Sequence, residues 1–177
     1  MAQEEKNSIF AIKIVPHLDA AYNLARWLAR NEQDAEDIVQ DAFIRAYSYL
    51  DSFSGKDGKT WLLAIVRNTF YSWRERKQVR QKVEVSDRTL DDLFISDSSR
   101  TPEAVFESKD TQEEVHKALN SLPVEFRETL ILWEIESMSY KEIASITGVP
   151  MGTVMSRLAR GREMLRTLLN NRWKGNV

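Results

Sequence analysis

The sequence predicts an all-α protein: two small helical bundles joined by a flexible acidic linker, with a helix-turn-helix in the second bundle. Three observations support this. Apolar residues recur at helical spacing through most of the 177 residues, and no stretch alternates as a strand would. A stretch rich in Asp and Ser, with few large apolar residues, divides the chain near its middle. We therefore expect bundles over residues 9–82 and 102–174, and a linker over residues 83–101.

The first bundle is expected to begin after a frayed tail over residues 1–7 and to contain a long helix over residues 33–50. The polar side of this helix carries Asp37, Gln40, Asp41, Ile44 and Arg45. Asp41 and Arg45 are spaced to form an ion pair. A solvated face is the favoured interpretation from the residues alone. A docking surface is the alternative, because an isoleucine on a solvated face gains nothing there.

A polar loop over residues 51–59 follows, and it contains one aromatic residue, Phe53. Thr60 is expected to cap a helix that begins at Trp61 and ends in a basic block. Aromatic side chains beside arginines and lysines are typical of surfaces that bind melted DNA, where bases stack on rings and phosphates meet cations. The alternative is that these aromatic residues belong to the core. They are Trp61, Phe70, Tyr71 and Trp73.

Charge is distributed in blocks along the chain. The net charge is −2, which by itself argues against binding to nucleic acid. However, residues 66–82 and 155–174 are strongly basic, and residues 84–114 between them are strongly acidic. Two basic blocks indicate two DNA-facing surfaces. Solvated surface charge is the alternative explanation.

Residues 139–166 predict two helices joined by a tight turn. Ser139 and Glu142 have the spacing of a capping box, Gly148 suits a left-handed helix end, and Pro150 suits the entry to the next helix. On the second helix, the residues opposite the buried stripe are small, polar or basic, as a helix in the major groove requires. An ordinary amphipathic helical hairpin is the alternative.

Several functional classes are excluded by what the sequence lacks. The chain contains no cysteine, so disulfides and thiolate metal sites cannot form. We find no phosphate-binding glycine loop, no metal-spaced cluster and no nucleophile with a base. The prediction is therefore a non-enzyme without catalytic, metal or cofactor sites. Neither a membrane-length apolar run nor a leader peptide is evident, so a cytoplasmic protein is expected.

Five stretches occur in order along the chain. They are DAEDIVQDAFIRAY (34–47), DSFSG (51–55), TWLLAIVRNTFYSWRERK (60–77), LNSLPVEFRETLIL (119–132) and SYKEIASITGVPMGTVMSRLARGREML (139–165). With these stretches the chain resembles a bacterial extracytoplasmic-function (ECF) sigma factor, of the compact two-domain class of the sigma-70 family. The resemblance implies a promoter-specificity subunit that binds core RNA polymerase and assists DNA melting, in a stress or envelope response.

The resemblance also implies roles for individual residues. The helix over residues 34–47 would dock on the clamp of the largest polymerase subunit through Asp37, Gln40, Asp41, Ile44 and Arg45, which reverses the interpretation of a solvated face. The melted minus-ten element would be read by Phe53, Gly55, Ile65, Asn68, Ser72, Arg74, Arg76 and Lys77. The upstream minus-thirty-five element would be read by Thr153, Met155, Ser156, Arg157, Ala159, Arg160 and Arg162.

The implied partners are core RNA polymerase, promoter DNA in duplex and melted form, and an anti-sigma factor. One alternative is a free-standing helix-turn-helix regulator, which would leave residues 34–47 without a function. A second is a pure interaction protein, against which both basic faces argue. The tether permits packed and extended arrangements of the two bundles.

Overall fold

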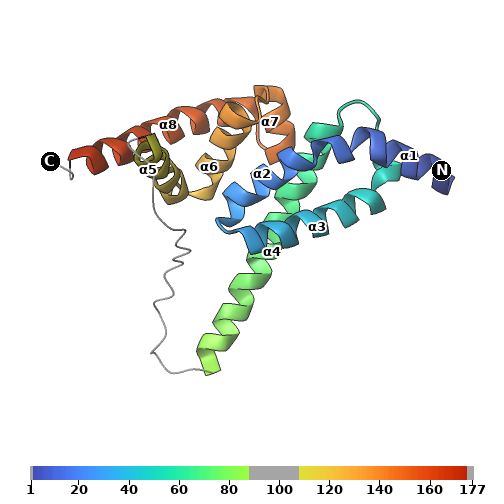
Figure 1. Cartoon of the computed structure of the whole chain (residues 1–177), viewed down its shortest axis with the longest axis horizontal. Coiled ribbons are helices and arrows are strands. Elements are labelled where there is room, and N and C mark those ends of the chain that lie inside the picture. The colour runs from blue at the N-terminus through green and yellow to red at the C-terminus, as the bar shows by residue number, and fades with distance from the viewer. Residues whose placement is uncertain (1, 88–107, 175–177) are drawn as a thin grey trace.

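The computed structural model describes residues 2–87 and 108–174, which are helical apart from short turns (Figure 1). No strand occurs in these two ranges, so the all-α prediction is confirmed. The N-terminal half contains α1 Gln3–Lys13, η1 Val15–His17, α2 Leu18–Ala29, α3 Glu32–Ser48, η2 Leu50–Ser52 and α4 Gly58–Asp87. The C-terminal half contains α5 Ser108–Ser121, α6 Val124–Leu130, η3 Ile131–Ile135, α7 Tyr140–Thr147 and α8 Met151–Lys174.

The core of the N-terminal half lies between α2, α3 and α4, which pack against one another. It is built from aliphatic side chains that recur at helical spacing, so each helix turns one apolar face inward. Its fully buried members include Leu24, Ala25, Ile38, Ala42, Leu62, Leu63 and Val66. This packing holds α3 and α4, the two helices of this half with predicted binding residues, in fixed positions.

The first helix begins at Gln3, so the frayed tail expected over residues 1–7 is wrong for the part that the structure describes. The hydroxyl of Tyr47 donates a hydrogen bond to Asn7 Oδ1 at 2.6 Å, and Lys6 Nζ lies 3.1 Å from Asp51 Oδ2. These partners are 40 and 45 residues away in sequence. Local composition therefore could not reveal that the tail is held against α3 and η2.

The start of α4 also differs from the prediction, which placed it at Trp61 with Thr60 as the cap. The helix begins at Gly58, and the Asp57 carboxylate accepts hydrogen bonds from the Thr60 backbone N–H at 3.0 Å and the Thr60 hydroxyl at 2.5 Å. Aspartate caps a helix as well as threonine does. A Cβ on Gly58 would lie 2.1 Å from the carbonyl oxygen of Lys13, so only glycine fits where α4 begins against the end of α1.

The far end of α4 projects away from the bundle (Figure 1). The helix continues to Asp87, so the first five residues of the linker predicted over 83–101 are helical. Good helix formers such as Gln and Lys continue the helix past the last packed turn. Residues 88–101 of the predicted linker, and the predicted start of the second bundle at residue 102, lie outside the described residues.

The C-terminal half contains the helix-turn-helix in α7 and α8. Ser139 Oγ accepts a hydrogen bond from the Glu142 backbone N–H at 3.2 Å, and the Glu142 carboxylate accepts one from the Ser139 N–H at 2.6 Å. This is the predicted capping box. Gly148 has a φ of 70°, the left-handed conformation expected at the turn. Helix α8 packs on α5, α6 and α7.

The two halves pack together in this structure, an arrangement that the sequence left open. Helix α2 contacts α6, and α4 contacts α7. The ring of Trp27 lies on that of His116, with centroids 4.6 Å apart. Nη2 of Arg127, which is only 2% exposed, donates to the carbonyl oxygen of Leu28 at 3.3 Å. Residues far apart in the chain therefore form one continuous core.

Candidate nucleic-acid interface

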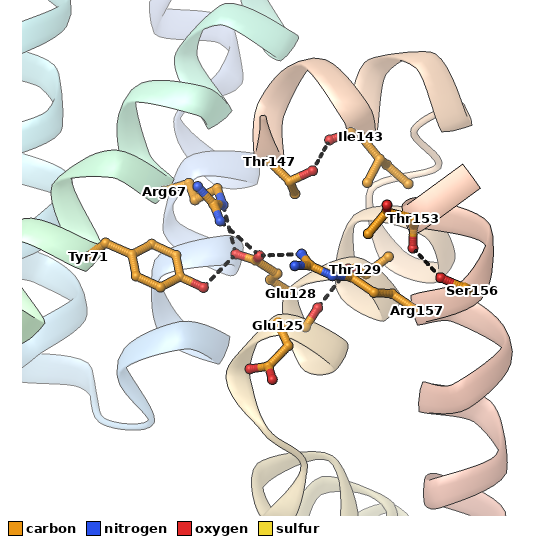
Figure 2. Close-up of polar contacts among 10 residues, drawn as sticks. All are labelled: Arg67, Tyr71, Glu125, Glu128, Thr129, Ile143, Thr147, Thr153, Ser156 and Arg157. Atoms are coloured by element: carbon orange, nitrogen blue, oxygen red, sulfur yellow. Dashed lines mark hydrogen bonds and ion pairs between the residues drawn. The ribbon is translucent and has the colours of Figure 1, made fainter. Parts of the chain in front are cut away.

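Helix α8 turns the predicted reading residues toward solvent. Val154 and Leu158 are buried, whereas Met155, Ala159 and Arg160 are exposed. Ser156 is exposed as well, and its hydroxyl donates to the carbonyl oxygen of Thr153 at 3.0 Å (Figure 2). The structure thus brings the centre of the predicted upstream-reading surface together on one open face.

Two arginines of the same predicted surface are engaged with acidic residues instead. Arg162 donates to Glu134 Oε1 at 2.9 Å. Arg157 is half-buried, and its Nη1 lies 3.8 Å from Glu128 Oε1 (Figure 2). Glu128 lies on α6 and Glu134 on η3, so spacing within α8 could not reveal these partners. The Arg157 guanidinium is therefore enclosed in this arrangement, whereas the ion pair of Arg162 is exposed, with side chains 45% and 55% exposed, and holds it only weakly.

Helix α4 carries some of the predicted contacts to melted DNA on one side. Asn68 and Ser72 lie on the wall of an open hollow of about 480 Å³, together with Arg74. Ile65, the third predicted member of this face, is half-buried. The other lining residues are Tyr71, Glu75 and Gln78. A hollow with amide, hydroxyl and guanidinium groups can both hydrogen-bond a base edge and neutralise a phosphate.

The loop before α4 holds Phe53 less freely than predicted. Its ring lies on that of Trp61, with centroids 5.1 Å apart, and the side chain is half-buried. Gly55 has a φ of 80°, which favours glycine at this point of the loop. A base could therefore stack only on the ring face of Phe53 that Trp61 does not cover, unless the Phe53 ring moves away from Trp61.

The remaining predicted cations of α4 face α3. Arg76 Nη2 lies 3.6 Å from Asp41 Oδ2, and Lys77 Nζ lies 2.9 Å from Asp34 Oδ2 and above the ring of Trp73. The expected partner of Asp41 was Arg45, one turn along α3; the structure instead pairs Asp41 with Arg76. Helices α3 and α4 pack side by side, so a cation on α4 can compete for Asp41 with a cation on α3 itself.

A second hollow, of about 450 Å³, lies between these helices. It is lined by Asp34, Asp37, Gln40, Asp41, Trp73, Arg76, Lys77 and Arg80. Three of the predicted polymerase-binding residues and two of the predicted DNA-binding residues therefore share one site. Ile44 stands apart from it on α3 and is 66% exposed, as the docking interpretation requires.

Sequence reasoning missed Glu128. Its side chain is completely buried, and its carboxylate accepts hydrogen bonds from Arg67 Nε at 2.9 Å, Arg67 Nη2 at 3.1 Å and the Tyr71 hydroxyl at 3.2 Å. Burial raises the pKa of Glu128, while the hydrogen bonds and charge of Arg67 oppose the rise. Burial and the nearby Glu128 raise the pKa of Tyr71 to about 12. The signal in the sequence was a charged pair, Arg127 and Glu128, one residue before the apolar run that begins at Leu130.

Within residues 2–87 and 108–174, no group of three or more acidic or histidine side chains could hold a metal ion. None of the helices in the same ranges combines the length and apolar character needed to cross a membrane.

Comparisons with known proteins match both halves. The family described as Sigma-70 region 2 matches residues 14–80, and the family described as Sigma-70, region 4 matches residues 112–165. The chain is 36% identical to the ECF RNA polymerase sigma factor SigE of Mycolicibacterium smegmatis over 86% of its own length, and it spans 58% of that relative. It is 36% identical to the ECF RNA polymerase sigma-E factor of Escherichia coli K12, over 75% of this chain and 72% of the relative.

Two solved structures are similar over almost the whole chain. One is the sigma factor RpoE in complex with the anti-sigma factor NepR from Bartonella quintana, with a TM-score of 0.67, 30% identity, and coverage of 96% of this chain and 98% of that one. The other is CnrH in complex with the cytosolic domain of CnrY, with a TM-score of 0.62, 26% identity, and coverage of 96% and 90%.

Proposed function

Because the chain belongs to the ECF RNA polymerase sigma factors of the sigma-70 family, we propose that it binds core RNA polymerase, directs it to specific promoters and assists DNA melting at initiation. The observation that carries the proposal is the open face of α8 around Ser156 and Arg160, in a chain whose other half matches sigma-70 region 2. Such a factor works with the polymerase in the cytoplasm, in a stress or envelope response.

The upstream element is read from α8. Ser156, Ala159 and Arg160 form the centre of the reading face, with Met155 at its edge and Thr153 near the helix start. Arg160 is the exposed guanidinium at this centre, which suits it for bidentate contact with a guanine. Arg157 and Arg162 bind phosphates of the upstream element after releasing their present partners, Glu128 and Glu134.

The melted element is held by α4 and the loop before it. Asn68 and Ser72 offer hydrogen bonds to an unstacked base in the hollow beside them, and Arg74 lies on its wall. Ile65 and Phe53 supply apolar contacts to the base. The turn at Gly55 sets the path of the backbone in this loop. Arg76 and Lys77 would bind phosphates of the strand after exchanging their present partners, Asp41 and Asp34.

Helix α3 is the surface proposed to dock on the polymerase clamp. Asp37, Gln40 and Ile44 are exposed on it, and Asp41 and Arg45 are half-buried beside them. An exposed isoleucine surrounded by polar groups has the composition of an interface centre. The similar structures were solved with anti-sigma partners, which supports the further proposal that an anti-sigma factor holds this chain inactive.

Run-off transcription with purified core polymerase and a panel of promoters tests the proposal. Promoter-specific transcripts that require this protein are expected. A free-standing regulator would bind duplex DNA equally tightly with and without core polymerase, and would give no such transcripts. An interaction protein without a DNA function would bind neither the duplex nor the promoter complex.

A further inference from the structure

Two exposed methionines lie at the start of α8, the helix proposed to read the upstream element. Met151 is 49% exposed and Met155 is 47% exposed. They are four positions apart, so they lie one above the other on consecutive turns, and the exposed Ala159 continues the row at the same spacing. We call these three residues the methionine row. Single exposed apolar residues are normal on a protein surface, but a contiguous group of them indicates a binding surface.

The first turns of α8 carry no charge beside the methionine row. Residues 151–156, MGTVMS, contain no charged side chain, and the arginines of the helix begin only at Arg157. The hydroxyl of Ser156 already donates to the carbonyl oxygen of Thr153. A Cβ at Gly152 would meet no atom within 4 Å, so the surface beside the methionines is open. The start of α8 therefore presents mainly apolar groups to a ligand.

The major groove of DNA offers one apolar group that such a surface can recognise. A helix in this groove contacts base edges with its N-terminal residues. The apolar group on those edges is the C5-methyl group of thymine. We infer that Met151 and Met155 are specificity residues, which recognise thymines of the upstream element by packing against their methyl groups. This inference rests on the proposed function and names the chemical group that the start of α8 reads.

The charges around the methionine row favour duplex DNA as its occupant. Lys141 on α7 is exposed, as are Arg160 and Arg166 on α8. Glu142, an acid near this rim, is held by the capping box at the start of α7. In a duplex, phosphates flank the methyl groups of the groove, so a basic rim around an apolar row matches both.

The spacing of the row also fits successive base pairs. Four residues of α-helix span about 6 Å, which is close to two base-pair steps of about 3.4 Å. Met151 and Met155 therefore reach base pairs that are about two steps apart. Arg160 lies five residues beyond Met155, or about 7.5 Å, and reaches about two steps further. The unbranched, flexible methionine side chain can follow a methyl group on either strand.

Replacing thymine by deoxyuridine tests the inference, because it removes only the methyl group from the DNA. Core polymerase loaded with the full chain first selects promoters from a randomised duplex library. We expect the selected upstream elements to contain thymines at two positions, about two base pairs apart. Each replacement by deoxyuridine should weaken binding about fourfold, the equivalent of about 0.8 kcal/mol for burying one methylene-sized group. At the same positions, 5-methylcytosine should bind more tightly than cytosine.

Substitutions then assign each methyl effect to one residue. Met155→Gln replaces the thioether by a polar group of similar length, so it should bind the thymine and deoxyuridine duplexes equally at one of the two positions. Met155→Leu keeps an apolar contact and should keep the difference. Met151→Gln should abolish the difference at the other position. Met164→Gln is the matched control, because Met164 is 36% exposed on the same helix but lies well beyond the row, and it should change neither position.

Equal binding of thymine and deoxyuridine duplexes by the parent would overturn the inference, as would a methyl effect that survives in both glutamine variants of the row. Glutamine variants that leave DNA binding unchanged would assign the row to a protein partner instead. Failure of the proposed function gives a different result: the loaded polymerase would then select no promoter from the library, and the inference would fall with it.

Discussion

Asp41 on α3 and Arg76 on α4 form an ion pair at 3.6 Å. The pair links the surface proposed to bind the polymerase to the surface proposed to bind the melted strand. Both side chains are about half exposed, at 50% and 54%, so the pair contributes little stability by itself. Its importance is positional, since a partner that attracts Asp41 would free Arg76 for the contact proposed with the melted strand.

Ile44→Asp should weaken binding to core polymerase by about 1–2 kcal/mol, because it places a charge at the centre of the proposed docking surface. Stability should change by less than about 0.5 kcal/mol, since the side chain is exposed. Ile12→Asp is the matched control, because Ile12 is 65% exposed and Ile44 is 66% exposed, on different helices. Fluorescence anisotropy with labelled protein measures both affinities. Equal losses would contradict the docking assignment.

Arg160→Ala should reduce affinity for the cognate upstream element by about 1–3 kcal/mol and relax specificity at one base pair. Arg166→Ala, an exposed arginine further along α8, is the control and should have a smaller effect. Binding of the polymerase complex to cognate and substituted promoters is the measurement. If Arg160→Ala loses the same affinity on every sequence, Arg160 contacts phosphate and does not read a base.

Gly161→Val should destabilise the C-terminal half by about 1–3 kcal/mol, because it overpacks the contact between α8 and α6. A Cβ at this position would already lie 3.1 Å from Leu130 Cδ1 and 3.5 Å from Phe126 Cβ. At Gly152, in the first turn of the same helix, a Cβ would meet no atom within 4 Å. The free energy of unfolding of Gly152→Val, measured in urea, should therefore remain within about 0.5 kcal/mol of that of the parent. Similar losses for both would contradict the packing of Gly161 against Leu130 and Phe126 as the cause.

Asp57→Ala should lower the free energy of unfolding by about 1 kcal/mol through loss of the α4 cap. Although burial alone would raise the pKa of Asp57, its hydrogen bonds with Thr60 bring it below the ordinary 3.8. A lowered folded-state pKa means that the ionised cap stabilises the protein above the unfolded-state pKa. This contribution is lost as pH falls through the folded-state value, below about 4.

The free energies of unfolding of Asp57→Ala and of the parent should therefore become equal at acidic pH. Asp19→Asn is the control. It also removes an acid near the start of a helix, but Asp19 does not cap α2. A difference between Asp57→Ala and the parent that stays constant down to pH 3 would show that the charge of Asp57 is not involved.

Local signals allowed part of this structure to be predicted. The capping box of Ser139 and Glu142 and the turn at Gly148 depend on residues within ten positions, so the helix-turn-helix could be placed closely. The burial of Val154 and Leu158 follows from the helical period. The predicted reading face of α8 is exposed for the same reason.

Contacts that depend on tertiary packing could not be predicted in this way. Arg67 and Glu128 are 61 residues apart, and Lys59 and the Glu136 carbonyl are 77 apart. No periodicity within one helix reports such a pairing. The start of α4 was misplaced because two adequate capping residues, Asp57 and Thr60, lie three positions apart. Packing of Gly58 against Lys13 favours the earlier start.

The stack of Trp27 on His116 gives the molecule an optical reporter of its own state. Burial and the nearby Arg26 lower the pKa of His116, which favours the uncharged ring against the indole where the two halves pack together. Separation of the halves would transfer that indole to water. The emission of Trp27, isolated by comparison with a Trp27→Phe protein, would therefore report any separation of the halves without an attached dye.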